Sequence, residues 1–158
     1  LGHEEAVEGG SRFTLSFDAE ICDDVVHAPV EIRTDLSDIS NKRILLAEDN
    51  EIIQSVTVKI LTTAGALVTS ACDGKKALQC YLEDRQKFDL ILTDIMMPEM
   101  NGYEFTAALR HDGCKLPIVG VTAATIGEEQ KRLLEAGADH VLPKPFSLKA
   151  LYDVLDWN

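Results

Sequence analysis

The sequence lacks the features of several common functional classes. No stretch approaches the roughly 18 consecutive apolar residues of a membrane-spanning helix, and the N-terminal LGHEEAVEGG lacks the basic start and the apolar middle of a signal peptide. Neither GxGxxG nor GxxxxGK is present, which excludes the usual dinucleotide-binding and P-loop sites. We therefore expect a soluble, cytoplasmic protein without a membrane segment.

Paired cysteines and clustered positive charge are also lacking. The four cysteines form no CxxC pair and have no histidine at zinc-finger spacing, which predicts reduced thiols. The net charge of -12 argues against nucleic acid binding through a basic face. This charge is uneven, since residues 1–40 hold ten acidic and two basic residues, whereas residues 41–158 hold seventeen and thirteen. A domain boundary near Ser40 follows.

From Arg43 onward, short apolar runs alternate with amphipathic stretches. This alternation is typical of a doubly wound α/β fold with a parallel sheet. It predicts five strands, at residues 43–48, 66–71, 89–93, 116–122 and 139–143. The first helix is expected over residues 51–65, with one apolar face made of Ile53, Val56, Ile60 and Leu61. We expect Ile52 and Val56 to be core residues, although a docking patch beside the site would use residues of this kind.

The first forty residues follow another pattern. GGSRFTLSF alternates Phe13, Leu15 and Phe17 with polar residues, which predicts one half-buried strand. One strand does not fold alone, so residues 1–18 would be an incomplete piece of a domain. Residues 19–41 are acidic and predict a disordered linker. The domain expected to fold independently is therefore 42–158.

Polar side chains end four of the five predicted strands. They are Glu48 and Asp49 after the first strand, Asp94 after the third, Thr122 after the fourth and Lys144 after the fifth. In a five-stranded sheet of order 2-1-3-4-5, these four strands are neighbours. Their carboxyl ends share the crevice at the topological switch point, where such sheets bind ligands. We therefore expect the five side chains to form one site.

These residues predict a phosphoryl-transfer site that uses a metal ion. Three converging carboxylates repel one another unless a cation neutralises them. Ligation by a few oxygen atoms favours Mg²⁺ over Ca²⁺, and zinc would lack its usual His or Cys ligands. Asp94 would attack phosphorus, with Lys144 and Thr122 binding the phosphoryl oxygens, and would form an aspartyl phosphate. No general base is needed, because an ionised carboxylate is already a nucleophile.

Four segments, in this order and spacing, resemble the receiver domain of two-component response regulators. They are LLAEDN, LILTDIMMPEMNG, VGVTAAT and HVLPKPF, and the resemblance covers roughly residues 42–157. It implies a flavodoxin-like α/β three-layer sandwich with Asp94 as phosphoacceptor and Thr122 and Lys144 as phosphoryl contacts. It also implies a cis peptide bond between Lys144 and Pro145. The implied Mg²⁺ ligands are Glu48, Asp49, Asp94 and the backbone carbonyl of Met96.

The chain departs from the receiver pattern at two places. The aromatic switch position, three residues before Lys144, is Val141, so an aromatic rotamer cannot report phosphorylation. The positions two beyond Asp94 and two beyond Thr122 are Met96 and Ala124, and neither side chain can orient an attacking water. We therefore expect a phosphoaspartate that hydrolyses slowly and is suited to onward relay.

A second, shorter resemblance concerns the N-terminus. GGSRFTLSF resembles the last glycine box and the following strand of a histidine-kinase ATP-binding domain, which interprets residues 1–18 as the end of such a domain. A kinase, a linker and a receiver form a hybrid histidine kinase. This chain lacks the upstream boxes, so we expect it neither to bind ATP nor to phosphorylate itself on histidine. The implied partners are a phosphohistidine donor and, without an output domain after Trp157, a histidine phosphotransfer protein.

Several other interpretations stay open at this point. The polar strand ends, taken singly, are also typical of helix caps and solvated surface residues, and only their joint placement favours a site. Haloacid-dehalogenase-type phosphatases use similar residues but need a second Asp where Met96 stands. Flavodoxin-like cofactor modules have a phosphate loop rich in Ser, Thr and Gly, whereas AEDN would repel a phosphate. A stand-alone regulator with a non-catalytic tail is a further alternative. Separately, GGSRFTLSF could be a disordered end of the chain and not the end of a kinase domain.

Overall fold

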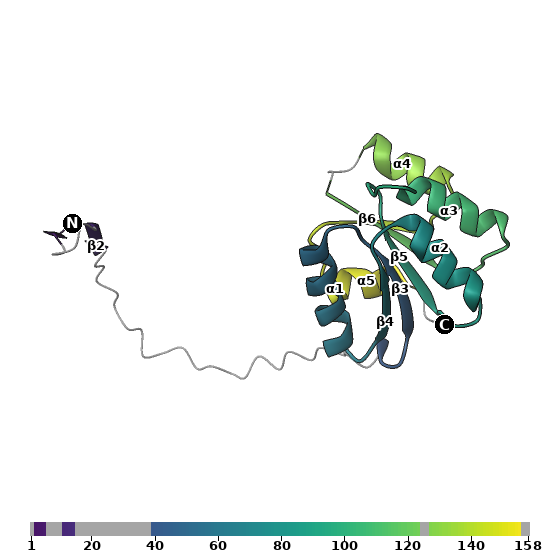
Figure 1. Cartoon of the computed structure of the whole chain (residues 1–158), viewed down its shortest axis with the longest axis horizontal. Coiled ribbons are helices and arrows are strands. Elements are labelled where there is room, and N and C mark those ends of the chain that lie inside the picture. Colours follow the sequence, from purple (N-terminus) through teal and green to yellow (C-terminus); the bar gives the residue numbers. More distant parts are fainter. Residues whose placement is uncertain (1, 6–10, 15–38, 124–126, 156–158) are drawn as a thin grey trace. The chain divides into compact units, whose positions relative to one another are not determined.

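The structure is a computed structural model that describes residues 2–5, 11–14, 39–123 and 127–155 (Figure 1). The chain divides into two units, Leu1–Arg33 and Thr34–Asn158. Among the described residues of either unit, no helix combines the length and the hydropathy needed to cross a membrane.

The first unit contains a pair of antiparallel strands. Strand β1 (Gly2–Glu5) pairs with β2 (Ser11–Thr14), so that Gly2 lies opposite Thr14. The sequence predicted a strand over the second segment but missed the first, because GHEE has no apolar alternation. The expected positions of Leu15 and Phe17, and most of the expected linker, lie outside the described residues.

Five parallel strands form the sheet of the second unit, in the order β4-β3-β5-β6-β7. Counted along the chain, this is the predicted order 2-1-3-4-5, and each strand begins and ends within two residues of its predicted bounds. The central strands β5 and β6 are buried over almost their whole length, as their apolar sequences require. The strands are β3 (Arg43–Ala47), β4 (Leu67–Ala71), β5 (Leu90–Asp94), β6 (Ile118–Thr122) and β7 (His140–Pro143).

Helices cover both faces of this sheet (Figure 1). On one face, Leu61 of α1 and Leu151 of α5 are buried in one core cluster. On the other, Tyr81 of α2, Phe105 of α3 and Leu133 of α4 are buried in a second cluster. The predicted three-layer, doubly wound architecture is therefore confirmed. The helices are α1 (Glu51–Thr63), α2 (Gly74–Glu83), α3 (Gly102–His111), α4 (Glu128–Glu135) and α5 (Leu148–Asp153).

Helix α1 does not bury its apolar residues as predicted. Its buried residues are Thr57 and Leu61, whereas Ile52 is 77% exposed and Val56 is 53% exposed. The prediction that Ile52 and Val56 are core residues was wrong. Because successive helical residues are rotated by about 100°, a helix that faces the sheet through Thr57 turns Val56 away from it. Periodicity identified an apolar stripe, but it could not show how much of that stripe the sheet covers.

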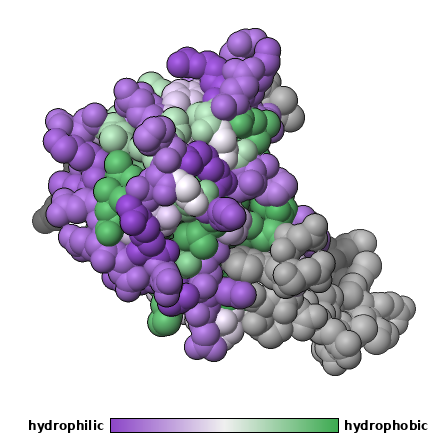
Figure 2. Space-filling model, turned by 90° about the vertical axis from the view of Figure 1, so that its right-hand side faces the viewer, coloured by the Kyte–Doolittle hydropathy of each residue, from purple (hydrophilic) through white to green (hydrophobic). Residues whose placement is uncertain are grey.

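The exposed part of this stripe is concentrated on one helix. Among the described residues, nine large hydrophobic side chains are exposed, and four of them, Ile52, Ile53, Val56 and Ile60, belong to α1. By contrast, the face of the molecule drawn in Figure 2 is mostly hydrophilic, with its hydrophobic residues in separate patches. The apolar surface of α1 is therefore an unusual feature of this molecule and calls for a functional explanation.

The loop between β5 and α3 is closed by a very close backbone approach. The amide of Gly102 donates to the carbonyl of Ile95 at 2.8 Å, and Asn101 caps α3 through a capping box. A Cβ atom on Gly102 would collide with the carbonyl oxygen of Asp94 and would lie 2.9 Å from the Cα of Ile95. Glycine at residue 102 therefore allows the close approach that holds the backbone at Asp94 in place.

The substitution Gly102→Ala is expected to lower the free energy of unfolding by about 3 kcal/mol, because backbone atoms cannot yield to the added methyl group. Urea denaturation measures this loss. Gly113→Ala is the control, since its Cβ would meet no atom within 4 Å. Its positive φ of 84° should cost only about 1 kcal/mol. Equal losses in the two variants would contradict the close-approach argument.

Candidate functional site

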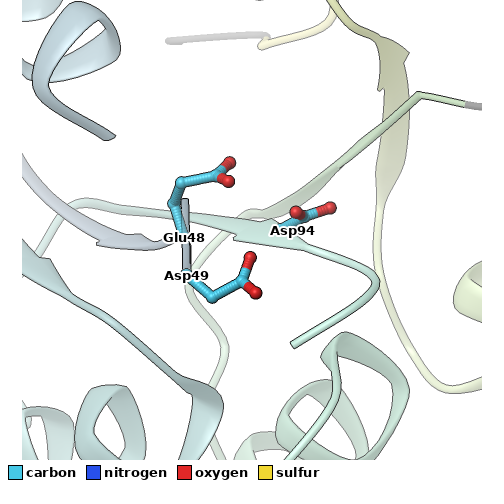
Figure 3. Close-up of side chains that lie close together, drawn as sticks. All are labelled: Glu48, Asp49 and Asp94. Carbon is cyan, nitrogen blue, oxygen red and sulfur yellow. The ribbon is translucent and has the colours of Figure 1, made fainter. Parts of the chain in front are cut away.

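Three carboxylates meet at the carboxyl edge of the sheet. Ala47 of β3 pairs with Thr93 of β5, so the next residues, Glu48 and Asp94, emerge side by side. One oxygen atom each of Glu48, Asp49 and Asp94 lies within 4.8 Å of the others. Figure 3 shows the three side chains arranged around a common space. The parallel register therefore brings together the carboxylates that the sequence predicted to converge.

Lys144 balances this negative charge. It follows β7, and its Nζ donates to Glu48 Oε2 at 2.6 Å and to Asp94 Oδ2 at 2.8 Å. The amide of Lys144 donates to the carbonyl of Thr122 at 2.7 Å, which fixes the start of the loop. The following Lys144–Pro145 peptide bond is cis, the isomer expected from the sequence. One ammonium group thus bridges two carboxylates that lie far away in the sequence.

The electrostatics of this bridge follow from burial and charge. Burial raises the pKa of Glu48, and the negative charge of Asp94 raises it further. The hydrogen bond from Lys144 lowers this pKa, but the net effect is a pKa above the usual value. For Lys144, burial lowers the pKa, but the hydrogen bonds and charges of the two carboxylates outweigh it and leave the pKa raised. Lys144 therefore remains a cation at neutral pH.

Thr122 lies on the other side of Asp94. Asp94 pairs with Val121 of β6, so Thr122 is the next residue at the same edge, and it is only 6% exposed. Its hydroxyl donates to Glu129 Oε2 of α4 at 3.3 Å. Glu129 lines the same pocket as the predicted site residues. The sequence analysis missed it, because Glu129 is one of several acidic residues on a surface helix.

A second residue missed from the sequence supports the acidic loop. Gln54 of α1 donates through Nε2 to the carbonyl of Glu48 at 2.8 Å and to that of Ala71 at 3.1 Å. Asn50 caps the same helix, accepting from the amides of the two isoleucines that follow Glu51. A glutamine one turn after an Asn cap was the available signal. These bonds hold the loop that carries Glu48 and Asp49.

The remaining predicted positions lie as follows. Met96 lies in the loop after β5, lines the same pocket and is 67% exposed. Val141 lies in β7 and is half-buried, and as a valine it offers no aromatic ring at this position. Ala124 lies outside the described residues. Participation of the Met96 carbonyl in metal binding stays a prediction.

The donor set fits a hard divalent cation. Glu48, Asp49 and Asp94 offer three carboxylate oxygens at close range and no sulfur or imidazole nitrogen. Mg²⁺ needs only one or a few protein carboxylates, because it retains several waters. The arrangement can therefore hold Mg²⁺ next to a carboxylate that is flanked by an ammonium group and a hydroxyl.

Comparison with known families decides between the open interpretations. A family model described as the response regulator receiver domain matches residues 44–156. The chain belongs to this family. Receiver domains bind Mg²⁺ at an acidic site, and this receiver has a cluster of three carboxylates at the carboxyl edge of its sheet. The prediction of a receiver in two-component phosphorelay signalling is confirmed, and the interpretations as a haloacid-dehalogenase-type phosphatase or as a flavodoxin-like cofactor module are excluded.

The relatives of this receiver include large sensor kinases. It is 38% identical over 122 residues to hybrid signal transduction histidine kinase I of Dictyostelium discoideum, covering 73% of this chain and 7% of the relative. It is 34% identical over 133 residues to sensor histidine kinase RcsC of Escherichia coli K12, covering 84% of this chain and 14% of the relative. The chain thus spans only a small part of these proteins, and the stand-alone alternative is less favoured.

A solved structure has the same fold. The receiver domain of sensor histidine kinase PA1611 of Pseudomonas aeruginosa, with a magnesium ion coordinated in its active-site cleft, has a TM-score of 0.65 and 33% identity. The match covers 73% of this chain and 94% of the other. The identity and the shared topology together support the flavodoxin-like receiver fold.

Proposed function

We propose that this receiver takes a phosphoryl group from a phosphohistidine onto Asp94, in a Mg²⁺-dependent reaction, and passes it to a histidine phosphotransfer protein. The observation that carries this proposal is the position of Asp94. Its carboxylate ends the central strand β5, lies 2.8 Å from Lys144 Nζ and belongs to the cluster with Glu48 and Asp49. A carboxylate with a cation and two further acidic groups around it is equipped for phosphoryl transfer.

Each side chain has a definite part in this reaction. An oxygen of Asp94 forms a bond to phosphorus, while the bond from phosphorus to the donor imidazole nitrogen breaks and that nitrogen keeps the electron pair and takes a proton. Lys144 and the Thr122 hydroxyl donate hydrogen bonds to the phosphoryl oxygens. Mg²⁺, when bound, neutralises charge on these oxygens. Glu48, Asp49, Asp94 and the Met96 carbonyl would hold it.

The exposed stripe of α1 supports a helical partner. A groove of about 350 Å³ is lined by Ile52, Val56, Ile60 and Phe146, and it reaches Asp94 and Lys144 at one end. An amphipathic helix places its apolar face in such a groove. Because the groove and the acidic site share residues, a helix seated there brings its own phosphohistidine, or its acceptor histidine, against Asp94. This continuity favours a histidine phosphotransfer protein as the occupant.

The substitution Val56→Asp is expected to slow phosphoryl transfer between the receiver and a histidine phosphotransfer protein by roughly tenfold or more, since it places a charge in an apolar contact. Phosphorylation by a small phosphodonor should not change, because Val56 does not touch the reacting atoms. Both rates are measured by phosphate-affinity electrophoresis. Leu82→Asp is the matched control, since Leu82 is 45% exposed on α2. Equal protein-transfer rates in the two variants would refute docking at α1.

The wider organisation is part of the same proposal. We assign residues 1–18 to the end of a kinase ATP-binding domain, residues 19–41 to a linker and residues 42–158 to the receiver, as in a hybrid histidine kinase. The paired strands β1 and β2 support strand structure in the first segment. Because the phosphohistidine is made from ATP, the proposal places the receiver in the cytoplasm. Transfer from the purified kinase domain of the parent protein, lost on chelation of Mg²⁺, is the decisive test.

A further inference from the structure

Glu129 is a fourth carboxylate beside the phosphorylation site. It lies in the first turn of α4, and its Oε2 accepts the hydrogen bond from the Thr122 hydroxyl. Lys144 is engaged with Glu48 and Asp94, and Arg132 of α4 lies 4.6 Å from the centre of the Tyr103 ring. Among the described residues, therefore, no cation forms a salt bridge with Glu129.

The bond between Thr122 and Glu129 competes with the proposed role of Thr122. A threonine hydroxyl has a single proton to donate. Donation to Glu129 and donation to a phosphoryl oxygen on Asp94 therefore exclude each other. In addition, a phosphoryl group with a charge near minus two would stand next to the Glu129 carboxylate and repel it.

The same bond ties the first turn of α4 to the sheet. Gly127 at the N-cap of α4 offers no side-chain hydrogen bond to the helix, unlike the capping residues Asn50, Asp73, Asn101 and Ser147 of the other helices. Leu133, which is fully buried, anchors the later part of α4. Loss of the Thr122–Glu129 bond would thus loosen the beginning of α4 and leave its end in place.

We propose that Glu129 is a positioning residue that opposes phosphorylation, and that the phosphoryl group breaks its bond to Thr122 and releases the first turn of α4. This rests on the proposed role of Asp94 as phosphoacceptor. It gives the receiver a way to report phosphorylation that needs no aromatic side chain at Val141. The device consists of a hydroxyl with two alternative acceptors, one in the resting protein and one in the phosphorylated protein.

The test compares Glu129→Gln with Glu128→Gln. Both variants lose one negative charge in the same helical turn, but only Glu129 accepts from Thr122. The rate of aspartyl phosphate formation is measured with acetyl phosphate and saturating Mg²⁺ at low and high ionic strength. Glu129→Gln should raise the second-order rate constant of phosphorylation roughly three- to tenfold at low salt, with a smaller gain at high salt. Glu128→Gln should change it by less than about twofold.

Hydrogen exchange separates this device from a purely structural role. In the wild-type receiver, phosphorylation should speed exchange of the first amides of α4, and Glu129→Gln should show part of this increase before phosphorylation. Equal phosphorylation rates for Glu129→Gln and Glu128→Gln would overturn the inference, and so would exchange of the α4 amides that phosphorylation leaves unchanged. Neither result would contradict phosphorylation of Asp94. A wild-type receiver that takes no phosphoryl group would instead refute the proposed function, and the inference with it.

Discussion

Asp94→Asn is expected to abolish phosphorylation of this receiver by small phosphodonors and by phosphohistidine. The amide has nearly the shape of the carboxylate, but its oxygen carries no full negative charge and is a poor nucleophile. The substitution also removes one of the three clustered carboxylates and, within the part of the chain that the structure describes, leaves Glu48 as the acidic partner of Lys144. We expect a rate loss of more than about a thousandfold, equivalent to about 4 kcal/mol in the barrier.

Intact-protein mass spectrometry after incubation with acetyl phosphate and Mg²⁺ measures this effect directly. The wild-type receiver should gain one phosphoryl group, and chelation of Mg²⁺ should prevent the gain. Asp153→Asn is the matched control, because Asp153 is an exposed residue of α5 that pairs with Lys149. A phosphoryl adduct that forms equally well on Asp94→Asn would show that another residue is the acceptor.

The parts of the site that the sequence predicted are those fixed by backbone geometry. In a parallel sheet, residues that end neighbouring strands emerge at one edge, so the strand order alone brings Glu48, Asp94 and Thr122 together. The pairing of Ala47 with Thr93 sets them at the same level. No knowledge of side-chain rotamers is needed for this step. The strand ends therefore predicted which side chains lie together at this edge of the sheet.

The parts that the sequence did not predict depend on how surface helices are rotated and placed. Glu129 reaches Thr122 only because α4 begins where it does, and nothing in EEQKRLLE distinguishes this glutamate from its neighbours. Likewise, the apolar residues of α1 indicated a buried face, yet the sheet covers only the side that carries Thr57 and Leu61. The sequence pattern gives the amphipathic character of a helix, while the fraction that is covered depends on tertiary packing.

The lifetime of the phosphoaspartate is expected to be long, with a half-life of many minutes or more. Hydrolysis needs a water molecule aligned for attack on phosphorus, and a side chain that orients this water lowers the barrier. The exposed Met96 side chain lines the pocket beside Asp94, but its thioether is only a weak acceptor and has no donor. Ala124, two residues beyond Thr122, has a methyl side chain without any polar group. Water can reach the site, but these two side chains cannot hold it in line.

The substitution Met96→Gln tests this explanation, because its amide can bind and orient a water at nearly the same side-chain length. We expect the phosphoryl half-life to shorten roughly three- to thirtyfold, a change of about 0.6 to 2 kcal/mol in the barrier. Met96→Leu is the apolar control and should keep the wild-type lifetime. Phosphate release from the isolated phosphorylated receiver, in the absence of any partner, gives the rate. Equal lifetimes for Met96→Gln and Met96→Leu would contradict the explanation by residue 96. A wild-type half-life of seconds would contradict the proposed relay, because a phosphoryl group lost that fast leaves little time for transfer to a partner docked at α1.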